Sequence, residues 1–333
     1  MLIKSTVWVA FASFLILTGQ DALGQANSSI EVKVLVLNYD PFVPYANENG
    51  EARLHEALKW NDPRKLAEGY IADLDKATAG AVRLKVVDWK DVDRFPLKKD
   101  GFRYITGTYL TCHQTGKGWH DPDIVDYAQV VAENGVAELI NKGAVDEVWL
   151  FGAPYFGYWE SAMAGPRSFY INGGPFPAIK TERPFVIMGF SYERGVGEML
   201  HDLSHRVEST MEHFSGGWKV DQLTTDWARF AANAKQSNGE AGAGTCHYPP
   251  NGEKDYDYDN KRVVQSTADD WLNYPNLTGR KTEVNCETWG GPDYHRNYFI
   301  WWFTHLPKAA GVNSKTGMQN NWWRYVYRYD SSL

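Results

Sequence analysis

Two histidines four residues apart, His201 and His205, are the side chains in this sequence best placed to do chemistry. Residues 195–211 have a helical pattern, and side chains four apart on a helix point the same way, one turn from each other. Two imidazoles in this arrangement can bind one metal ion. At about 100° per residue, Glu208 and Glu212 fall on the same stripe. The spacing therefore predicts a helix that offers metal ligands along one face.

Two other interpretations of this stripe remain open. A charged stripe is commonly the solvated face of an amphipathic helix, where a pair such as Glu198 with His201 adds roughly 0.2–0.5 kcal/mol. The same side chains could instead form a buried polar network without an ion. The stripe contains no lysine, however, and Arg206 lies on a different side of the helix. Because a solvated face usually mixes charges of both signs, this composition favours a metal site.

The run His201-Asp202-Leu203-Ser204-His205 resembles the H-E-x-x-H helix of zincin metallopeptidases, with Asp202 in the place of that family's glutamate. The resemblance implies that the two histidines bind zinc and that Asp202 activates water for attack on a carbonyl group. Position 211, where metzincins have a third histidine, is Met211, and aspartate is one methylene shorter than glutamate. The resemblance therefore implies a chemistry and not a fold.

A catalytic zinc ion usually has three protein ligands and keeps a fourth position open. We expect His247 to be the third ligand, because the two prolines of its loop, residues 242–251, restrict the conformations open to that loop. Glu208 is another candidate, although it lies roughly 7.5 Å along the helix axis from the expected metal position. His295 and His305 are further candidates for the third ligand, but each could equally be an ordinary histidine packed among tryptophans.

A hydrolytic metal site also needs a general base. Glu160 is the candidate outside the helix, because it follows the predicted strand 147–152 through a glycine-rich loop. Active sites of parallel sheets gather at the carboxyl ends of the strands. Glu160 could alternatively complete a His-His-Glu ligand set. Asp202 and Glu198 are the candidates on the helix, and Asp40, just past the first strand, is a further one.

Three aspartates, Asp255, Asp257 and Asp259, alternate with tyrosines before Asn260. Clustered carboxylates and carbonyls suit a hard cation such as calcium. The spacing lacks the glycine and the terminal glutamate of an EF-hand. The segment is therefore either a calcium loop or a solvated loop.

Strands alternate with helices in the first two thirds of the chain. Apolar runs predict strands, and capped periodic segments predict helices, at residues 32–39, 62–79, 82–87, 123–141, 147–152, 183–190 and 195–211. This order predicts an α/β fold with a mostly parallel sheet flanked by helices. We expect an α/β core over residues 26–215, and a Trp-rich, loop-rich lid or second lobe over residues 216–333 packed on it.

The N-terminus and the composition suggest where the protein works. Residues 1–25 have the pattern of a secretory signal peptide, and no later apolar run reaches the length of a membrane anchor. We therefore expect a secreted or periplasmic protein. The net charge of −7 argues against nucleic acid as a partner. The 14 Trp and 19 Tyr suit an extracellular peptide, polymer or glycan substrate.

The mature chain would keep three cysteines, Cys112, Cys246 and Cys286. In an oxidising compartment the favoured disulfide joins Cys246 to Cys286, although three cysteines allow three pairings.

Three hypotheses of function follow from these patterns. The first is a secreted zinc-dependent hydrolase that cleaves an amide or ester bond in a peptide or cell-wall polymer. The second is a metal-independent carbohydrate-active or carbohydrate-binding protein, which the aromatic content and the paired acids Glu160 and Glu208 would suit. The third is a non-enzymatic exported protein in which the stripe is structural. The sequence has no G-x-S-x-G elbow, P-loop or G-x-G-x-x-G motif to support a serine hydrolase, an NTPase or a dinucleotide-binding enzyme.

Overall fold

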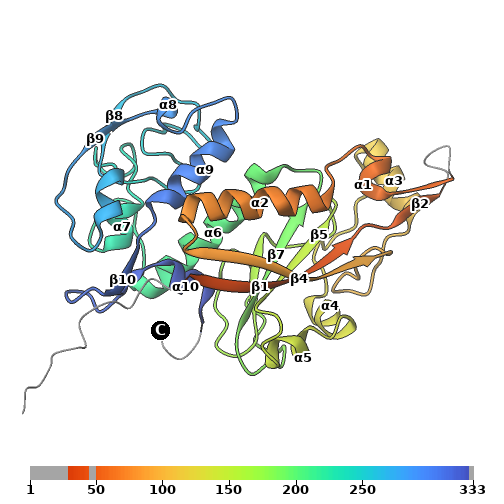
Figure 1. Ribbon diagram of the computed structural model, residues 1–333. Helices are drawn as coiled ribbons and strands as arrows, with labels where there is room; N and C mark the ends of the chain where they lie inside the picture. The colour runs from red at the N-terminus through yellow and green to blue at the C-terminus, as the bar shows by residue number, and fades with distance from the viewer. Residues whose placement is uncertain (1–28, 45–49, 330–333) are drawn as a thin grey trace, which may run out of the picture.

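The computed structural model describes residues 29–44 and 50–329, so the predicted signal peptide over residues 1–25 lies outside the described residues. A five-stranded sheet forms the centre of the described part (Figure 1). Its strands, in spatial order, are β4 (Val82–Val92), β1 (Ile30–Tyr39), β5 (Glu147–Gly152), β7 (Phe185–Ser191) and β6 (Ser161–Ala164).

Four of the five strands are parallel. β1 pairs in parallel with β4 and with β5, and β5 pairs in parallel with β7, whereas β6 runs antiparallel to β7. A strand that is covered on both faces of the sheet has a continuous apolar sequence. β5 is such a strand, since all six of its residues are buried. The predicted α/β fold with a mostly parallel sheet flanked by helices is confirmed.

Helices cover both faces of this sheet. α2 (Pro63–Thr78) and α6 (Val196–Ser215) pack together on one face, and α4 (Tyr127–Glu133) and α5 (Val136–Asn141) lie on the other (Figure 1). α2 begins where Asp62 accepts a hydrogen bond of 2.8 Å from the backbone N–H of Arg64, with proline in the first helical position. Among the described residues, no helix is long and apolar enough to cross a membrane.

One predicted helix differs from its prediction, and several short elements were not expected from the sequence. The helix predicted over residues 123–141 is two helices, because Gly135 takes a left-handed conformation, with φ of 65°, between α4 and α5. Its N-cap is Asp126, whose side chain accepts from the N–H of Gln129, while Asp123 forms an ion pair with Lys98 instead. Short elements not expected from the sequence are β2 (Phe42–Pro44), β3 (Glu51–Arg53), α1 (Leu54–Ala57) and α3 (Thr106–Thr115).

The C-terminal third consists of short elements separated by long loops. They are α7 (Asp226–Phe230), β8 (Val264–Ser266), a 3-10 helix (Ala268–Asn273), β9 (Thr282–Val284), α8 (Cys286–Trp289), α9 (Tyr294–His305), β10 (Lys308–Val312), β11 (Gln319–Asn321) and α10 (Trp323–Tyr327). α9 packs on α2 and α6 (Figure 1). Trp302, Trp322 and Trp323 are fully buried, and one cluster of apolar side chains runs through the sheet, α6 and this aromatic third.

A buried ion pair attaches α6 to the sheet. The Arg206 guanidinium donates to the Glu147 carboxylate at 2.7 Å and to the Val326 carbonyl at 2.6 Å, and it lies over the ring of Tyr327. The Arg206 and Glu147 side chains are almost completely buried. Arg206 follows His205 directly, so this contact fixes the helix where the histidines lie.

We expect Arg206→Met to destabilise the protein by about 3–5 kcal/mol, because it leaves the Glu147 carboxylate buried without its cation. The measurement is the free energy of unfolding from urea denaturation. Lys142→Met is the matched control, because it breaks an exposed pair with Glu138 on α5 and should leave that free energy nearly unchanged. Equal, small effects of both substitutions would contradict this role for Arg206.

Candidate metal centre

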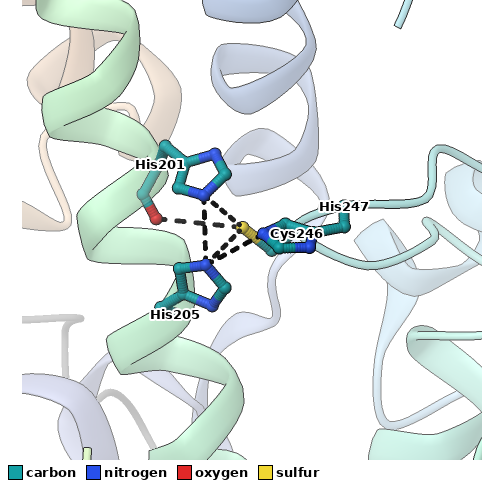
Figure 2. Close-up of side chains that lie close together, drawn as sticks. All are labelled: His201, His205, Cys246 and His247. Carbon is teal, nitrogen blue, oxygen red and sulfur yellow. Dashed lines mark hydrogen bonds between the residues drawn. The ribbon is translucent and has the colours of Figure 1, made fainter. Parts of the chain in front are cut away.

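Four side chains from two distant segments converge on one point (Figure 2). α6 supplies His201 and His205, and the loop after α7 supplies Cys246 and His247. His205 Nε2 lies 3.0 Å from His201 Nε2, 3.1 Å from His247 Nε2 and 3.5 Å from Cys246 Sγ. Cys246 Sγ is also 3.5 Å from His201 Nε2, and all four ligand atoms lie within 4.8 Å of one another.

Hydrogen bonds alone do not account for this cluster. A ring nitrogen of histidine carries either one hydrogen or one lone pair, so it can serve one well-aligned hydrogen bond at a time. His205 Nε2 has two nitrogens and a sulfur within 3.5 Å. A shared cation can bind all these atoms through their lone pairs at once, so the four side chains could hold a metal ion.

Packing against the aromatic third holds the loop over α6. Trp302 Nε1 donates to the Gly244 carbonyl at 2.9 Å, and the Tyr258 hydroxyl donates to the Cys246 carbonyl at 2.7 Å. Gly244 has a φ of 81°, and a Cβ there would lie 2.5 Å from the Tyr248 carbonyl oxygen. The turn therefore needs glycine, and it brings Cys246 and His247 to the helix.

Each histidine of the cluster has a polar partner at its other ring nitrogen. His205 Nδ1 is 3.4 Å from Glu208 Oε2, and His247 Nδ1 is 3.1 Å from Asp255 Oδ1. His201 Nδ1 is 3.4 Å from His295 Nε2. Such outer partners fix the tautomer and the ring orientation of metal-binding histidines, leaving Nε2 available to the ion.

The electrostatics of the cluster suit a bound cation. Burial, with the neighbouring His205 and His247, lowers the pKa of His201 to about 2, so its ring is neutral. Burial lowers the pKa of His205 as well, but a hydrogen bond to Glu208 and the charge of Glu160 raise it overall. Burial and Glu208 raise the pKa of the Cys246 thiol well above its ordinary value. A metal ion would offset the cost of forming a thiolate there, and its binding would release that proton.

A cavity of about 700 Å³ opens beside the cluster. His201 lines it, together with the carboxylates of Glu160, Glu198 and Asp202. Glu160 Oε2 lies 3.8 Å from His205 Nε2. Burial raises the pKa of the Asp202 carboxyl well above its ordinary value, and the charges of Glu160 and Glu198 raise it further. The cluster therefore faces a space that a small molecule or part of a polymer can enter.

The structure brings most of the candidates from the sequence to this site. His247 joins the two helical histidines, and Glu160 lies at the edge of the cluster. Glu208, considered as a ligand, is not one of the four, because its carboxylate reaches Nδ1 of His205 on the outer side of the ring. Its other oxygen accepts from the backbone N–H of Cys246 at 2.6 Å.

Cys246 is the member of the cluster that the sequence analysis missed, and the disulfide predicted between Cys246 and Cys286 is wrong. All three cysteines, including Cys112, are free thiols. Cys246 Sγ faces the histidines and accepts a hydrogen bond of 2.8 Å from Ser204 Oγ, while Cys286 Sγ lies beside Glu287. The adjacency of Cys246 and His247 in the sequence is the signal that could have identified the second half of the site.

Other candidates lie outside the cluster. Asp40 is buried against His55, with their ring nitrogen and carboxylate 2.5 Å apart, and it does not line the cavity. His305 contacts Asp269 at the C-terminal end of α9. Glu198 lines the cavity, and its carboxylate lies 3.6 Å from Arg194.

The three aspartates considered for calcium do not converge. Asp255 contacts His247, whereas Asp257 accepts from the N–H of Glu253 and from the Asn260 amide. Among the described residues, the only group of three or more potential metal ligands is the cluster of His201, His205, Cys246 and His247.

We expect the purified protein to contain about one transition-metal ion per chain, and His205→Ala to lose it, since His205 Nε2 contacts every other donor. Metal content is measured by mass spectrometry on protein purified without a histidine tag. His213→Ala, an exposed histidine two turns further along α6, is the matched control and should keep the metal. Absence of metal from the wild type and both variants would contradict the site.

We expect Glu208→Gln to weaken metal binding by about 10- to 100-fold, because it removes the charge that holds His205 in orientation. The measurement is competition with a chromogenic chelator. Glu212→Gln, one turn further along the same helix and exposed, should leave the affinity unchanged. An equal loss in both variants would show that the effect is only one of net charge.

Comparisons with known proteins provide no family for this chain. No protein-family model, no curated protein and no solved structure matches it. The function must therefore be argued from the geometry of the cluster and of the cavity beside it.

Proposed function

We propose that this protein is a zinc-dependent hydrolase that cleaves an amide or ester bond. One observation carries the proposal: a cluster of three imidazoles and a thiol lies beside a cavity that its member His201 lines, and a carboxylate of that cavity, Glu160, lies 3.8 Å from His205 Nε2. A metal site built only for stability is normally closed, whereas a hydrolytic site keeps a position open to water and substrate.

The donor set and its spacing favour zinc. Nitrogen and sulfur donors suit this ion, with bonds of about 2.0–2.1 Å to nitrogen and about 2.3 Å to sulfur in a tetrahedron. Those bonds place two nitrogens about 3.3 Å apart, and a nitrogen and a sulfur about 3.5 Å apart. Four of the six distances between donor atoms, at 3.0, 3.1, 3.5 and 3.5 Å, are close to these values, and all four donor atoms lie within 4.8 Å of one another.

Bound zinc would supply Lewis-acid chemistry, lowering the pKa of a water molecule and polarising a carbonyl group. Glu160 is the proposed base, and it takes one proton from the attacking water. The water oxygen forms a bond to the carbonyl carbon, and the bond from that carbon to nitrogen or oxygen breaks. The proton then passes to the leaving group, so the products are a carboxylic acid and an amine or alcohol.

Glu160 takes the role that the zincin resemblance implied for Asp202. Both carboxyl groups line the cavity, and that of Glu160 lies 3.8 Å from Nε2 of His205. Asn172 donates a hydrogen bond to Glu160 Oε2 and fixes its direction. Asp202 and Glu198 remain as neighbouring acids that position substrate or water.

A second candidate function is a structural zinc site that ties the loop to α6. Cys246 is 1% exposed and four donors are present, which is the number that closes a tetrahedral site. Metal removal separates the two functions. A structural ion would be needed for the folded state, whereas a catalytic ion can leave a folded and inactive protein.

The first test is removal of the metal by a chelator, followed by its return. We expect hydrolysis of acetyl esters and acylated amines to stop without metal and to recover on addition of one equivalent of zinc, with the fold retained by circular dichroism. Full activity of the metal-free protein would reject the proposal. Unfolding on metal removal would favour the structural function.

We expect Glu160→Gln to lower kcat by about 10²- to 10⁴-fold, the usual contribution of a general base, while zinc stays bound. The measurement is kcat for a chromogenic ester beside zinc content. Glu68→Gln on the exposed side of α2 is the matched control and should leave kcat unchanged. Unchanged kcat in Glu160→Gln would transfer the role to another acid of the cavity.

A further inference from the structure

We propose that the substrate of this site is an uncharged acylated sugar chain, bound by stacking on Tyr155 and Tyr256. This inference rests on the proposed function, because the acyl group is the part that would be hydrolysed. Both tyrosines line the cavity beside the metal cluster, and their side chains are also open to solvent, with 41% and 52% of each residue exposed.

The two tyrosines share an unusual backbone conformation. Tyr155 has a φ of 64° and Tyr256 a φ of 59°, in the left-handed region that favours glycine. Non-glycine residues held there cost backbone energy, and they concentrate at active sites and ligand clamps. Packing alone does not explain why two such residues, both with exposed aromatic rings, line the same cavity.

Contacts with neighbouring side chains hold the ring of Tyr155 in place. It stacks on Trp119 with ring centres 3.8 Å apart and planes 9° apart. Its carbonyl oxygen accepts a hydrogen bond of 2.6 Å from the buried ammonium group of Lys98, which is also paired with Asp123. The ring is therefore a fixed, flat surface and not a mobile side chain.

Contacts to the metal cluster hold Tyr256. Its backbone N–H donates to the His247 carbonyl at 2.9 Å, and its ring centre lies 4.5 Å from the His247 ring. It also stacks near His201, at 5.7 Å between ring centres and with planes 21° apart. A group resting on this ring therefore lies next to the metal ligands.

The side chains of the cavity disfavour an anionic substrate. Four carboxyl groups line it, from Asp123, Glu160, Glu198 and Asp202. Apart from histidine, the only cationic side chain among the described residues of its lining is Arg194, which already lies 3.5 Å from Glu193 and 3.6 Å from Glu198. Away from the proposed metal, no uncommitted cationic side chain of this lining is therefore placed to bind a phosphate, a sulfate or a chain-end carboxylate.

The sheet edge beside Glu160 does not offer an extended peptide a place to bind. Peptides in extended form pair with an exposed strand edge. β6, which follows Glu160 directly, has its outer edge occupied, because Phe176 N–H donates to the Met163 carbonyl at 2.9 Å and Gly165 N–H donates to the Phe176 carbonyl at 3.2 Å. Aromatic faces beside an acidic, cation-poor cavity instead suit a sugar ring, which has apolar C–H faces and neutral hydroxyls.

In the proposed reaction an N-acyl or O-acyl group of the sugar enters the cavity toward the cluster. Water adds to the acyl carbon, and the bond from that carbon to the sugar nitrogen or oxygen breaks. The sugar leaves as an amine or alcohol that takes up the proton, and the acyl group leaves as a carboxylic acid. The sugar chain itself stays intact.

The test is calorimetric binding of a tetramer of N-acetylglucosamine to the zinc-loaded Glu160→Gln protein, which should not turn it over. We expect Tyr155→Ala and Tyr256→Ala each to raise Kd by about 3- to 10-fold, the size of an aromatic stacking contact. Tyr155→Phe and Tyr256→Phe keep the ring and should keep the affinity. Tyr170→Ala, an exposed tyrosine outside the cavity lining, is the matched control. If an alanine variant fails to fold, a leucine substitution at the same position takes its place.

Several outcomes would overturn the inference. It fails if an uncharged tetrapeptide binds through the two tyrosines and the sugar does not. It also fails if nothing binds while acetyl esters are hydrolysed with zinc dependence, in which case the proposed hydrolase stands. If the sugar binds through the two tyrosines but the zinc-loaded wild-type protein releases no acetate from it, the hydrolase is rejected, and the inference fails as a statement about substrate.

Discussion

The convergence of three imidazole nitrogens and a buried sulfur is the contact on which the rest of this structure depends. His205 Nε2 alone has three such neighbours within 3.5 Å, which is more than its single hydrogen or lone pair can serve. A cation at the centre would turn this crowded arrangement into a favourable one. It would tie the loop that carries Cys246 and His247 to α6, and so the aromatic third of the chain to the α/β sheet.

Neither half of the molecule contains the site by itself. The sheet fixes α6 through the ion pair of Arg206 and Glu147, one residue beyond His205. The aromatic third fixes the loop through Trp302 and the hydroxyl of Tyr258. The buried tryptophans beneath the loop are therefore part of the metal site in a physical sense, because they set the position of the sulfur. The cavity forms where these two supports meet, with Glu160 coming from the sheet side.

The features that depend on residues close together in the sequence could be predicted from the sequence. His201 and His205 were identified from helical spacing, and the parallel sheet from the order of apolar runs. Cys246 was missed because a cysteine in a chain predicted to be exported first suggests a disulfide, and only tertiary packing shows which atoms the sulfur faces. Helical spacing correctly placed Glu208 on the same face of α6 as His201 and His205. It could not show that the Glu208 carboxylate contacts Nδ1 of His205, because spacing gives the face of a helix and not the atoms that a side chain contacts. The break at Gly135 was also missed, because the helical pattern of residues 123–141 continues on both sides of this glycine.

The metal ligands and the proposed substrate surface are joined by one short segment. Asp255 contacts Nδ1 of His247, and Tyr256, the next residue, lies against the His247 ring while half of the residue stays exposed. The left-handed backbone at Tyr256 turns its ring toward the cavity while its N–H stays bonded to the His247 carbonyl. A ligand on this ring would therefore contact the segment that orients His247. If the proposed metal and substrate bind as argued, their sites are coupled through two adjacent residues.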